Sequence, residues 1–465
     1  MFIGRERELA ELERLYQRAG FVMAVIYGRR RVGKTALINK FCQGKRHIFY
    51  IAIEQNNTGA LRSFSESILE IFPEAGKYLD VFPNWEKAFE YVAAQAKDER
   101  IILAIDEYPY IASGDQSVSS VLQKIIDTKM MPSQLFLILC GSSMSFMEHQ
   151  VLGYESPLYG RRTAQFKIEP FDYFDSAKFF PDYSLEEKIL AFSVVGGVPQ
   201  YLQNMAREGG FWNSLGMNFF RPDGHLFEEP ESLLKQELRE PALYNSIITA
   251  IATGSTRLNE IATKIGEDSK KCAKYIATLV ALHVVEKKRP LLNKESRNSI
   301  YTLSDNLFRF WFKFIPNNIK NIESDMGSYV VEHKVKPCIA EYTGKIFETI
   351  CIQYLSRRNR TLSLPFVYDD IGNWWGNNPE LMCQEEIDII AISGTNALFC
   401  ECKWRNEKAS EKMFFELMRK SELFKKVENK RYIIFSKGGF TKSLLDIAKK
   451  DERLELISIK DLFDF

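Results

Sequence analysis

The stretch that decides the fold reads Phe21-Val-Met-Ala-Val-Ile-Tyr27 followed at once by Gly28-Arg-Arg-Arg-Val-Gly-Lys-Thr35. The second part has the G-x-x-x-x-G-K-S/T spacing of a phosphate loop, and the apolar run predicts the strand that delivers such a loop. The residues that follow, Ala36-Leu-Ile-Asn-Lys-Phe41, predict a helix whose N-terminus faces the same anion. We therefore expect a nucleotide-phosphate site made by Gly28, Arg29, Arg30, Arg31, Val32, Gly33, Lys34, Thr35 and Ala36.

Two side chains of this loop carry specific expectations. Lys34 is expected to reach the β- and γ-phosphates as a point charge, and the Thr35 hydroxyl is expected to ligate Mg²⁺. The alternative is a chance glycine turn before a helix. The matching strand and helix on either side favour the phosphate loop.

A second acidic element supports the first. Ile101-Ile-Leu-Ala-Ile105 predicts a buried parallel strand, and it ends in Asp106-Glu107 as a Walker B element does. Asp106 is expected to hold Mg²⁺ through water, and Glu107 to polarise the water that attacks the γ-phosphate. In the alternative interpretation Asp106 only caps a turn and Glu107 is a solvated surface residue.

Composition indicates a multidomain chain. Its 465 residues exceed the size at which one core keeps growing, and its net charge of +1 excludes neither nucleic-acid nor protein partners. The chain opens with no signal peptide, and no apolar run approaches the ~20 residues that span a bilayer, so we expect a cytoplasmic protein with no membrane partner. The eight cysteines are scattered and are expected to be reduced core thiols.

The first half alternates strand and helix patterns. A strand is expected at residues 47–53, helices near 61–71, 85–96 and 118–130, and a further buried strand at 134–140 that ends in Gly141-Ser142-Ser143. Such alternation predicts an α/β fold with a doubly wound parallel sheet and ligands at the carboxyl ends of its strands. Ser142 or Ser143 is a candidate γ-phosphate sensor, and a serine helix N-cap is the alternative.

Several motifs together resemble one family. They are Phe2-Ile-Gly-Arg-Glu-Arg-Glu-Leu9, the two Walker elements, Ser156-Pro-Leu-Tyr-Gly-Arg-Arg162 and Gly196-Gly-Val-Pro-Gln-Tyr201. Over roughly the first 240 residues the chain resembles the archaeal-type ATPases, on the signalling branch of AAA-like P-loop proteins. The resemblance implies that Gly197 and Pro199, in a helical lid, contact the nucleotide base. It also implies that Arg161 or Arg162 senses the γ-phosphate, and a surface salt bridge is the alternative for this pair.

Helical spacing changes at about residue 244. Two short helices around a turn at Gly266-Glu-Asp-Ser269, followed by strands at 284–288 and 299–303 joined by a polar hairpin, predict a winged helix-turn-helix. Its lysines and arginine predict duplex DNA contact, although the resembling ATPases also carry this module as a structural lid; these basic residues are Lys264, Lys270, Lys271, Lys274, Lys287, Lys288 and Arg289. The aromatic segment at 305–314 predicts a helix that docks on a neighbouring domain and stops at Pro316.

A second site is expected in the last part of the chain. A long helix at 338–355 carries Glu348, a loop at 371–376 follows, and two strands then carry Asp388 and Glu401-x-Lys403. This acidic-acidic-lysine pattern resembles restriction-endonuclease-like nucleases, and the segment resembles the DUF234-type domain fused to archaeal-type ATPases. Asp388, Glu401 and Glu348 are expected to bind Mg²⁺ and Lys403 to act on the attacking water. An inactive ion-pair network is the alternative.

These inferences combine into one domain plan. We expect a P-loop ATPase core at residues 1–170, a helical lid at 171–240, a winged helix with its linker helix at 241–330 and an αβββαβ restriction-endonuclease-like domain at 331–465. The leading function is an ATPase that couples ATP and Mg²⁺ to DNA binding and to metal-dependent cleavage, as in defence or mobile-element systems. The expected partners are ATP, DNA and further copies of the chain in a homo-oligomer. The alternatives are a nucleotide-gated signalling switch that does not cut and a DNA-binding regulator.

Overall fold

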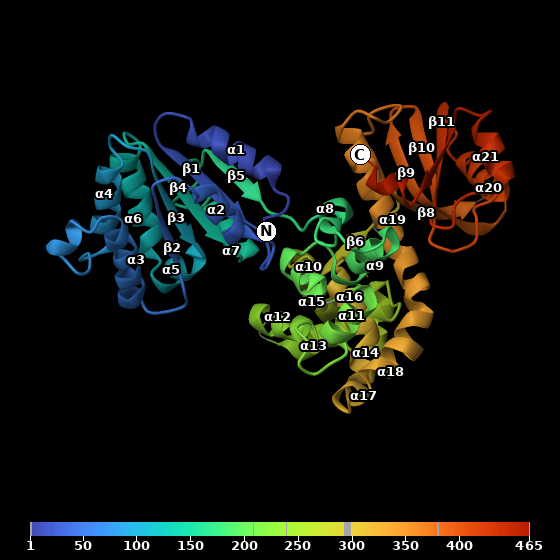
Figure 1. Ribbon diagram of the computed structural model, residues 1–465, viewed down its shortest axis with the longest axis horizontal. Coiled ribbons are helices and arrows are strands. Elements are labelled where there is room, and N and C mark those ends of the chain that lie inside the picture. Colours follow the sequence, from blue (N-terminus) through green and yellow to red (C-terminus); the bar gives the residue numbers. More distant parts are fainter. Residues whose placement is uncertain (1, 208, 239, 293–298, 379–380, 465) are drawn as a thin grey trace. The chain divides into compact units, whose positions relative to one another are not determined.

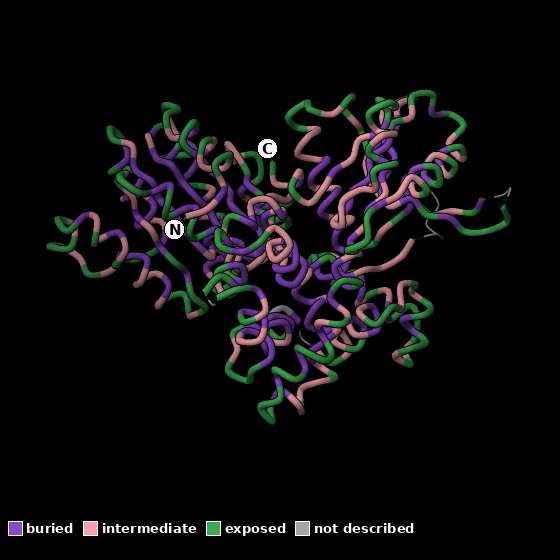
Figure 2. Tube along the Cα trace, turned by 45° about the vertical axis from the view of Figure 1, so that its right-hand side comes forward, coloured by how far each residue is buried: buried purple, intermediate pink, exposed green. Residues whose placement is uncertain are grey.

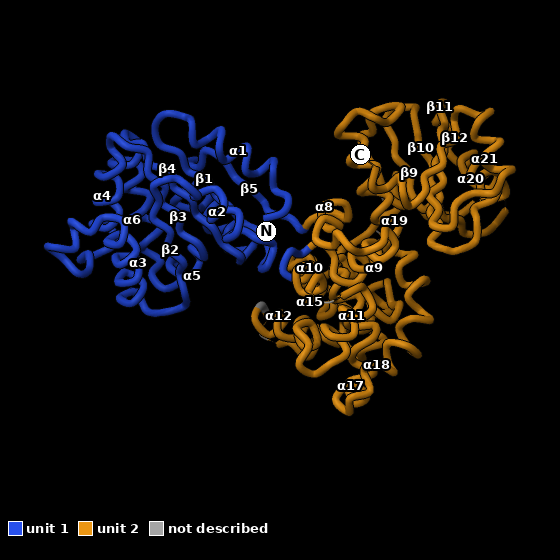
Figure 3. Tube along the Cα trace, in the orientation of Figure 1, with its two compact units in different colours: residues 1–170, 198–200 blue, residues 171–197, 201–465 orange. Residues whose placement is uncertain are grey.

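The computed structural model describes residues 2–207, 209–238, 240–292, 299–378 and 381–464. It divides into two compact units, of which unit 1 comprises residues 1–170 and 198–200 and unit 2 comprises residues 171–197 and 201–465 (Figure 3). The polar hairpin expected between the two strands near residue 290 falls largely on residues 293–298, outside the described residues. Each unit is described below by itself.

Unit 1 is built on one parallel sheet with the strand order β2-β3-β4-β1-β5. The strands are β1 (Val22–Tyr27), β2 (His47–Ile51), β3 (Ile101–Asp106), β4 (Leu135–Gly141) and β5 (Ala164–Lys167). Every residue of β1, β3 and β4 is buried, as expected for strands covered on both faces. The parallel α/β sheet predicted from the sequence is thereby confirmed.

Helices cover both faces of this sheet (Figure 1). They are α1 (Glu6–Tyr16), α2 (Lys34–Cys42), α3 (Asn57–Ile71), α4 (Trp85–Gln95), α5 (Tyr108–Gly114), α6 (Ser117–Ile125) and α7 (Met144–Phe146). Alternate residues of β1 enter two separate cores: Val25 packs with Phe64 and Phe89 of α3 and α4, and Ala24 packs with Leu37 of α2. In a doubly wound sheet the ligand site lies at the carboxyl ends of the strands, which here are the ends of β1, β3 and β4.

Unit 2 begins with helices and a small hairpin. The helices are α8 (Tyr173–Ala177), α9 (Leu185–Val195), α10 (Pro199–Ala206, whose first two residues belong to unit 1), α11 (Phe211–Phe219), α12 (Glu229–Glu237), α13 (Pro241–Ala252), α14 (Leu258–Ile265) and α15 (Ser269–Ala281). The antiparallel strands β6 (Val285–Lys288) and β7 (Ile300–Leu303) follow. We call residues 241–303 the helix–hairpin module. The cap of α15 is Asp268, whose side chain accepts from the amides of Lys270 and Lys271.

The aromatic helix α16 (Asn306–Phe314) docks on the earlier helices of unit 2, as expected. Trp311 Nε1 donates to the Phe227 carbonyl oxygen at 2.5 Å, and the Asn306 side chain donates to the Phe192 carbonyl oxygen at 2.9 Å. The Phe310 ring packs edge-on against Phe219. Helix α16 ends at Phe314, before Pro316, as expected, and a 3-10 turn (Pro316–Asn318) then leads into α17 (Ile319–Glu323) and α18 (Gly327–Val330).

The last part of unit 2 is a five-stranded sheet with the order β12-β11-β10-β9-β8. Its elements are α19 (Lys336–Arg360), β8 (Asp370–Asn378), β9 (Cys383–Ser393), β10 (Asn396–Lys403), α20 (Glu411–Ser421), β11 (Asn429–Ser436), α21 (Lys442–Ala448) and β12 (Leu454–Ser458). Helix α19 lies on one side of the sheet and α20 and α21 on the other (Figure 1). Buried residues run along the interior segments and exposed ones gather in loops (Figure 2).

The loop expected at residues 371–376 was wrong, because these residues belong to β8, which pairs with β9. The two glycines and three asparagines of β8 obscured the strand pattern, while Ile371, Trp374 and Trp375 are good strand formers. The pairing shifts by one residue between Gly372, opposite Ile390, and Trp374, opposite Ile387. Two residues of β9, Asp388 and Ile389, thus lie opposite Asn373 alone, which is the geometry of a β-bulge.

Candidate nucleotide and carboxylate sites

The phosphate loop connects β1 to α2 as its sequence predicts. Gly33 has φ of 89°, a left-handed conformation that favours glycine, and α2 begins at the next residue. At Gly28 a Cβ atom would lie 2.3 Å from the backbone oxygen of Ile168, so a side chain has no room there. Pro199 lies beside the loop, because a Cβ at Gly33 would be 3.7 Å from its Cγ.

Lys34 and Thr35 make the contacts that tie this loop to the second acidic element. The Lys34 side chain is only 5% exposed, and its ammonium group donates to the carbonyl oxygens of Gly28 at 2.9 Å and Arg29 at 3.0 Å. Burial lowers the pKa of this amine. The Thr35 hydroxyl donates to Asp106 Oδ2 at 2.5 Å. The fold therefore brings Thr35 and Asp106, which are 71 positions apart, into direct contact.

Glu107 and Ser142 also come together, from the ends of β3 and β4. One Glu107 carboxylate oxygen accepts from the Ser142 amide at 3.1 Å and from its hydroxyl at 2.8 Å. Glu107 has φ of 54°, uncommon for a residue with a side chain and often found at functional positions. Ser143 precedes α7 but makes no side-chain capping bond. The candidate catalytic carboxylate and the candidate sensor are thus direct partners.

The two candidate arginines differ in their contacts. Arg161 forms two bonds with the Asp127 carboxylate, at 2.8 and 2.6 Å, and donates to the carbonyl oxygens of Pro157 and Tyr159. Arg162 donates one long bond, 3.4 Å, to the Leu152 carbonyl oxygen. The salt-bridge alternative therefore describes Arg161, and Arg162 keeps donors for a ligand.

The structure also explains three residues of the family motifs. Arg5 donates to the backbone oxygen of Val32, inside the phosphate loop, at 3.2 Å and to that of Glu169 at 2.6 Å. It thus links the loop to the segment after β5, a role that the sequence did not reveal. Arg30 donates to the Tyr110 hydroxyl at 3.2 Å. In unit 2, Gly197 lies so close to the Phe171 backbone that a Cβ would sit 1.7 Å from its oxygen, so glycine is required there for packing.

In unit 2, the expected acidic residues lie around the bulge of β9. The Asn373 side chain donates to Glu348 Oε2 at 2.8 Å and to the Asp388 backbone oxygen at 2.7 Å. Asp388 Oδ2 accepts from the Cys402 amide at 2.8 Å. Asn373, which the sequence did not single out, thus links α19 to the bulge and satisfies the carbonyl that the bulge removes from the ladder.

Glu401 has a different partner. Its Oε1 atom lies 2.5 Å from Lys403 Nζ, and their side chains are 13% and 25% exposed. Among the residues that the structure describes, no group of three or more His, Cys, Asp or Glu is arranged to hold a metal ion. The expected trio therefore consists of a Glu348–Asp388 pair, which Asn373 links through the Asp388 backbone oxygen, and of Glu401, which is ion-paired with Lys403 and whose charge acts on Asp388.

The carboxyl groups of the first pair have unusual acidity. Burial, with the Asp388 charge nearby, raises the pKa of Glu348 to about 8. Burial, with the Glu401 charge nearby, raises the pKa of Asp388 to about 6, against the opposing effects of the Cys402 amide and Lys403. Both shifts mean that nearby protein cations do not fully compensate these negative charges. This donor set fits a divalent cation, which takes carboxylate oxygens and would relieve the repulsion.

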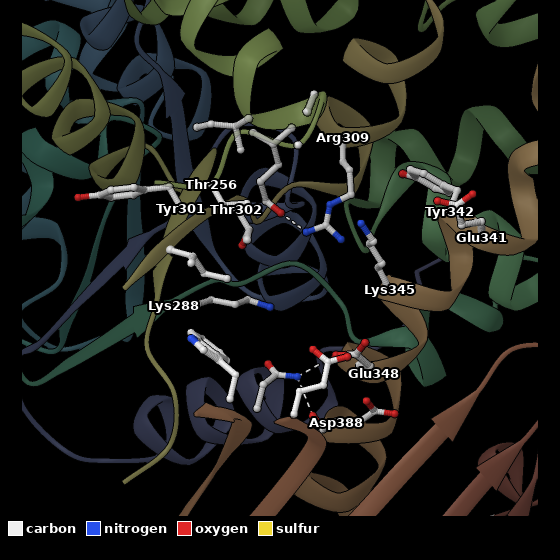
Figure 4. A pocket seen from close by; sticks show the side chains of 18 of the residues that line it. Thr256, Lys288, Tyr301, Thr302, Arg309, Glu341, Tyr342, Lys345, Glu348 and Asp388 are labelled. Carbon is white, nitrogen blue, oxygen red and sulfur yellow. Dashed lines mark hydrogen bonds between the residues drawn. The ribbon is translucent and has the colours of Figure 1, made fainter. Parts of the chain in front are cut away.

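A cavity of about 430 Å³ opens above this pair. The helix–hairpin module, α16, α19, β8 and β9 contribute its walls, with basic, acidic and aromatic side chains (Figure 4). Lys288, Arg309 and Lys345 reach in from above, and Glu348 and Asp388 lie below them.

No described helix is both long and apolar enough to cross a membrane.

Comparison with known proteins identifies the family. Residues 2–205 match the model of an ATPase domain predominantly from Archaea. An uncharacterised protein of Methanocaldococcus jannaschii is 33% identical over 428 residues, covering 91% of this chain and 92% of that protein. The chain belongs to the archaeal-type ATPases. Residues 311–414 match the DUF234 family, described as archaeal and bacterial proteins of unknown function.

Shorter and more distant similarities accompany this ATPase family. An uncharacterised ATP-binding protein of the same archaeon is 48% identical over 46 residues, 10% of this chain and 78% of that protein. The Walker-type ATPase of Pyrococcus abyssi has a TM-score of 0.48 at 19% identity, covering 67% of this chain and 96% of its own. Cdc6p from Pyrobaculum aerophilum has a TM-score of 0.33 at 11% identity, covering 70% of this chain and 94% of its own.

Proposed function

We propose that this ATPase binds ATP with Mg²⁺ at the phosphate loop and uses the nucleotide state to control nucleic-acid binding by unit 2. The observation that carries the ATP site is the 2.5 Å bond between Thr35 and Asp106. A hydroxyl and a carboxylate held together beside a phosphate loop supply the two oxygen ligands that P-loop enzymes give to Mg²⁺. The Mg²⁺ would neutralise charge on the phosphate oxygens.

The remaining residues of unit 1 have distinct roles in this proposal. The backbone of residues 28–36 surrounds the phosphates, and the buried Lys34 exchanges its two carbonyl partners for phosphate oxygens. Glu107 orients the attacking water, and Ser142 holds its carboxylate until a γ-phosphate competes for the hydroxyl. Arg162, whose donors are less engaged than those of Arg161, stabilises the γ-phosphate charge. Pro199 lines the nucleotide site next to Gly33.

The test is ATP binding and hydrolysis by two variants of the full chain. Lys34→Ala removes a buried charge from the phosphates and should bind ATP much more weakly. Glu107→Gln keeps the shape of the side chain and should bind ATP while losing hydrolysis. Hydrolysis by Glu107→Gln at the wild-type rate would show that another group activates the water.

A second candidate activity is metal-dependent phosphodiester cleavage in unit 2. The observation that favours it is the Glu348–Asp388 pair, with raised pKa values, at the base of a cavity lined by basic residues. In this proposal Glu348 and Asp388, joined by Glu401 once it separates from Lys403, would hold Mg²⁺, which would stabilise charge on the phosphodiester. Lys403 would separate from Glu401, so that the carboxylate could bind the metal and the lysine could act on the attacking water.

The cleavage test compares wild type with Lys403→Ala on single- and double-stranded substrates, with Mg²⁺ or Mn²⁺ and with or without ATP. Cleavage that is lost on Lys403→Ala supports the nuclease. If wild type neither cuts any substrate nor binds Mg²⁺ or Mn²⁺ by calorimetry, the non-cutting switch is the better account.

Duplex DNA binding by a winged helix is the third part of the proposal, and the contacts of its basic residues limit it. The helix–hairpin module has the element order of a winged helix. However, Lys271 pairs with Glu267 at 3.0 Å, and Lys264 donates to the Thr253 hydroxyl at 2.6 Å. Lys270 and Lys274, both exposed, are the side chains of α15 best placed for a duplex backbone. Reversing their charge should flatten the salt dependence of duplex binding.

A further inference from the structure

The cavity above Glu348 and Asp388 has three basic groups that come from three different elements. Lys288 lies on β6, Arg309 on α16 and Lys345 on α19, and Figure 4 shows their charged ends directed toward the same space. Arg309 donates to the Leu303 carbonyl oxygen, which leaves other donors of its guanidinium available. The fold therefore brings cations from three separate segments together on the side of the cavity that faces Glu348 and Asp388.

These cations only partly offset the carboxylates below them, because the Lys288 charge lowers the pKa of Glu348 less than burial and Asp388 raise it. Lys288 pairs with Glu286 on its own strand at 3.3 Å. Within the described residues, neither Lys288, Arg309 nor Lys345 forms an ion pair with Glu348 or Asp388. The space between the cations and the carboxylates suits a group that is itself anionic and can share a divalent cation with the carboxylates, which is the chemistry of a phosphodiester.

An aromatic side chain completes the wall. Tyr301, Trp374 and Trp375 all line the cavity, but the Tyr301 ring lies beneath Lys287 on the other face of the hairpin and the Trp374 ring packs on Phe424, so Trp375 is the ring that a base can reach. Aromatic faces next to a positively charged groove are the usual means by which proteins hold unpaired bases, because each base offers a face for stacking. A fully paired duplex keeps its bases stacked on one another and cannot use such a wall.

Size points the same way. A cavity of about 430 Å³ lies within the range of roughly 300–1,000 Å³ that encloses a small ligand. A B-form duplex, whose major groove alone is about 12 Å wide, is too large to enter it. One nucleotide of a single strand, with its phosphate and base, is of the right order.

We propose that this cavity takes one nucleotide of a single-stranded nucleic acid, with its phosphate between Lys288, Arg309 and Lys345 on one side and the Glu348–Asp388 pair on the other. The inference deepens the proposed nuclease candidate, on which it rests, by naming its substrate class. It also assigns Lys288 of β6 to the wall of the site next to the C-terminal sheet, and not to a contact with duplex DNA.

The experiment measures binding of a fluorescein-labelled oligothymidylate and of a blunt duplex of the same length to the full chain. Ca²⁺ is the cation, because it takes the same oxygen ligands, and a denaturing gel checks that the probe stays intact. Wild type should bind the single strand at least about tenfold more tightly than the duplex. A duplex bound as tightly as the single strand would overturn the proposal.

Matched variants localise the binding. Lys288→Ala and Lys345→Ala should each weaken single-strand binding about tenfold and reduce the slope of log affinity against log salt by roughly 0.7. Lys287→Ala, next to Lys288 but over the Tyr301 ring, is the control and should change neither value. Equal effects of Lys287→Ala and Lys288→Ala, or displacement of the strand by thymidine monophosphate at equal concentration, would overturn the assignment.

The outcomes separate this inference from the activities on which it builds. ATP hydrolysis by Lys288→Ala and Lys345→Ala should equal that of wild type, and a wild-type melting transition of unit 2 shows that the variants fold. Single-strand binding without cleavage in Mg²⁺ supports the cavity assignment and removes the nuclease candidate. Cleavage of duplex without single-strand preference supports the nuclease and overturns the cavity assignment.

Discussion

The acidity of Glu348 makes a quantitative prediction about stability. In the folded chain the pKa of this carboxyl rises from its ordinary value of 4.5 to about 8, because the group is buried next to Asp388. The folded state therefore favours the neutral acid. The contribution of the neutral carboxyl to the free energy of unfolding is therefore fully present below about pH 4.5 and is lost as pH rises through about 8.

The size of the effect follows from the shift. At about 1.4 kcal/mol for each pH unit, the rise from 4.5 to about 8 sets an upper limit of about 5 kcal/mol. Relaxation of the site and entry of water reduce such penalties, so we expect the ionised Glu348 to cost about 2 kcal/mol. For a unit of this size that corresponds to roughly 3 °C in the melting temperature.

The variant Glu348→Gln removes the charge and keeps an amide oxygen that can accept from Asn373. In EDTA, scanning calorimetry of wild type should show the unit 2 transition falling between about pH 5.5 and about pH 8.5, and Glu348→Gln should show a smaller fall. Mn²⁺ should raise the wild-type transition at the higher pH and raise that of Glu348→Gln less. The control is Glu341→Gln, an exposed residue on the same helix and the same cavity wall.

Two results would refute this reasoning. If Glu348→Gln and wild type show the same pH dependence in EDTA, the carboxyl is not held neutral by its surroundings. If Mn²⁺ stabilises both proteins equally, Glu348 is not among the groups that a divalent cation contacts.

Three further predictions concern the two sites. Lys34→Ala should raise the Kd for ATP at least about tenfold, measured by calorimetry, whereas Glu107→Gln should leave the Kd near wild type and lower the hydrolysis rate at least about a hundredfold. Arg162→Ala should lower kcat for ATP. Arg161→Ala, which removes the ion pair with Asp127 and the bonds to the Pro157 and Tyr159 carbonyl oxygens, should change kcat little and stability by about 1–2 kcal/mol. Asp388→Ala should abolish metal-dependent cleavage while ATP hydrolysis, measured by phosphate release, continues at the wild-type rate.

The fold of unit 1 could be predicted because its central strands are buried on both faces. Continuous apolar runs at β1, β3 and β4 have no helical competitor of that length, and the phosphate loop fixes the direction of the first one. The edge strand β5 was missed. Only Phe166 of its four residues is buried, so its sequence does not distinguish it from a surface loop.

The carboxylate site could be predicted only as a list of residues. The sequence placed Asp388 and Glu401 on neighbouring strands, and they are on β9 and β10. It could not show that β9 has a bulge at Asp388, because a bulge depends on the register with β8, a strand that itself was expected to be a loop. Asn373, which connects the bulge to Glu348, follows from that same register.

The basic run Lys287-Lys288-Arg289 shows why a charged stretch in a strand cannot be treated as one surface. Successive side chains of a strand point to opposite faces, so this run must divide. Lys288 lines the cavity, whereas Lys287 is exposed and lies over the Tyr301 ring. A contact of all three of these charges with one duplex would need them on one face, and the strand geometry denies this run that arrangement. The same geometry directs Lys288 into the cavity, to which the lining residues of β8 and β9 add no cation. The proposed site therefore needs the helix–hairpin module as well as the carboxylates, and exists only when unit 2 is folded.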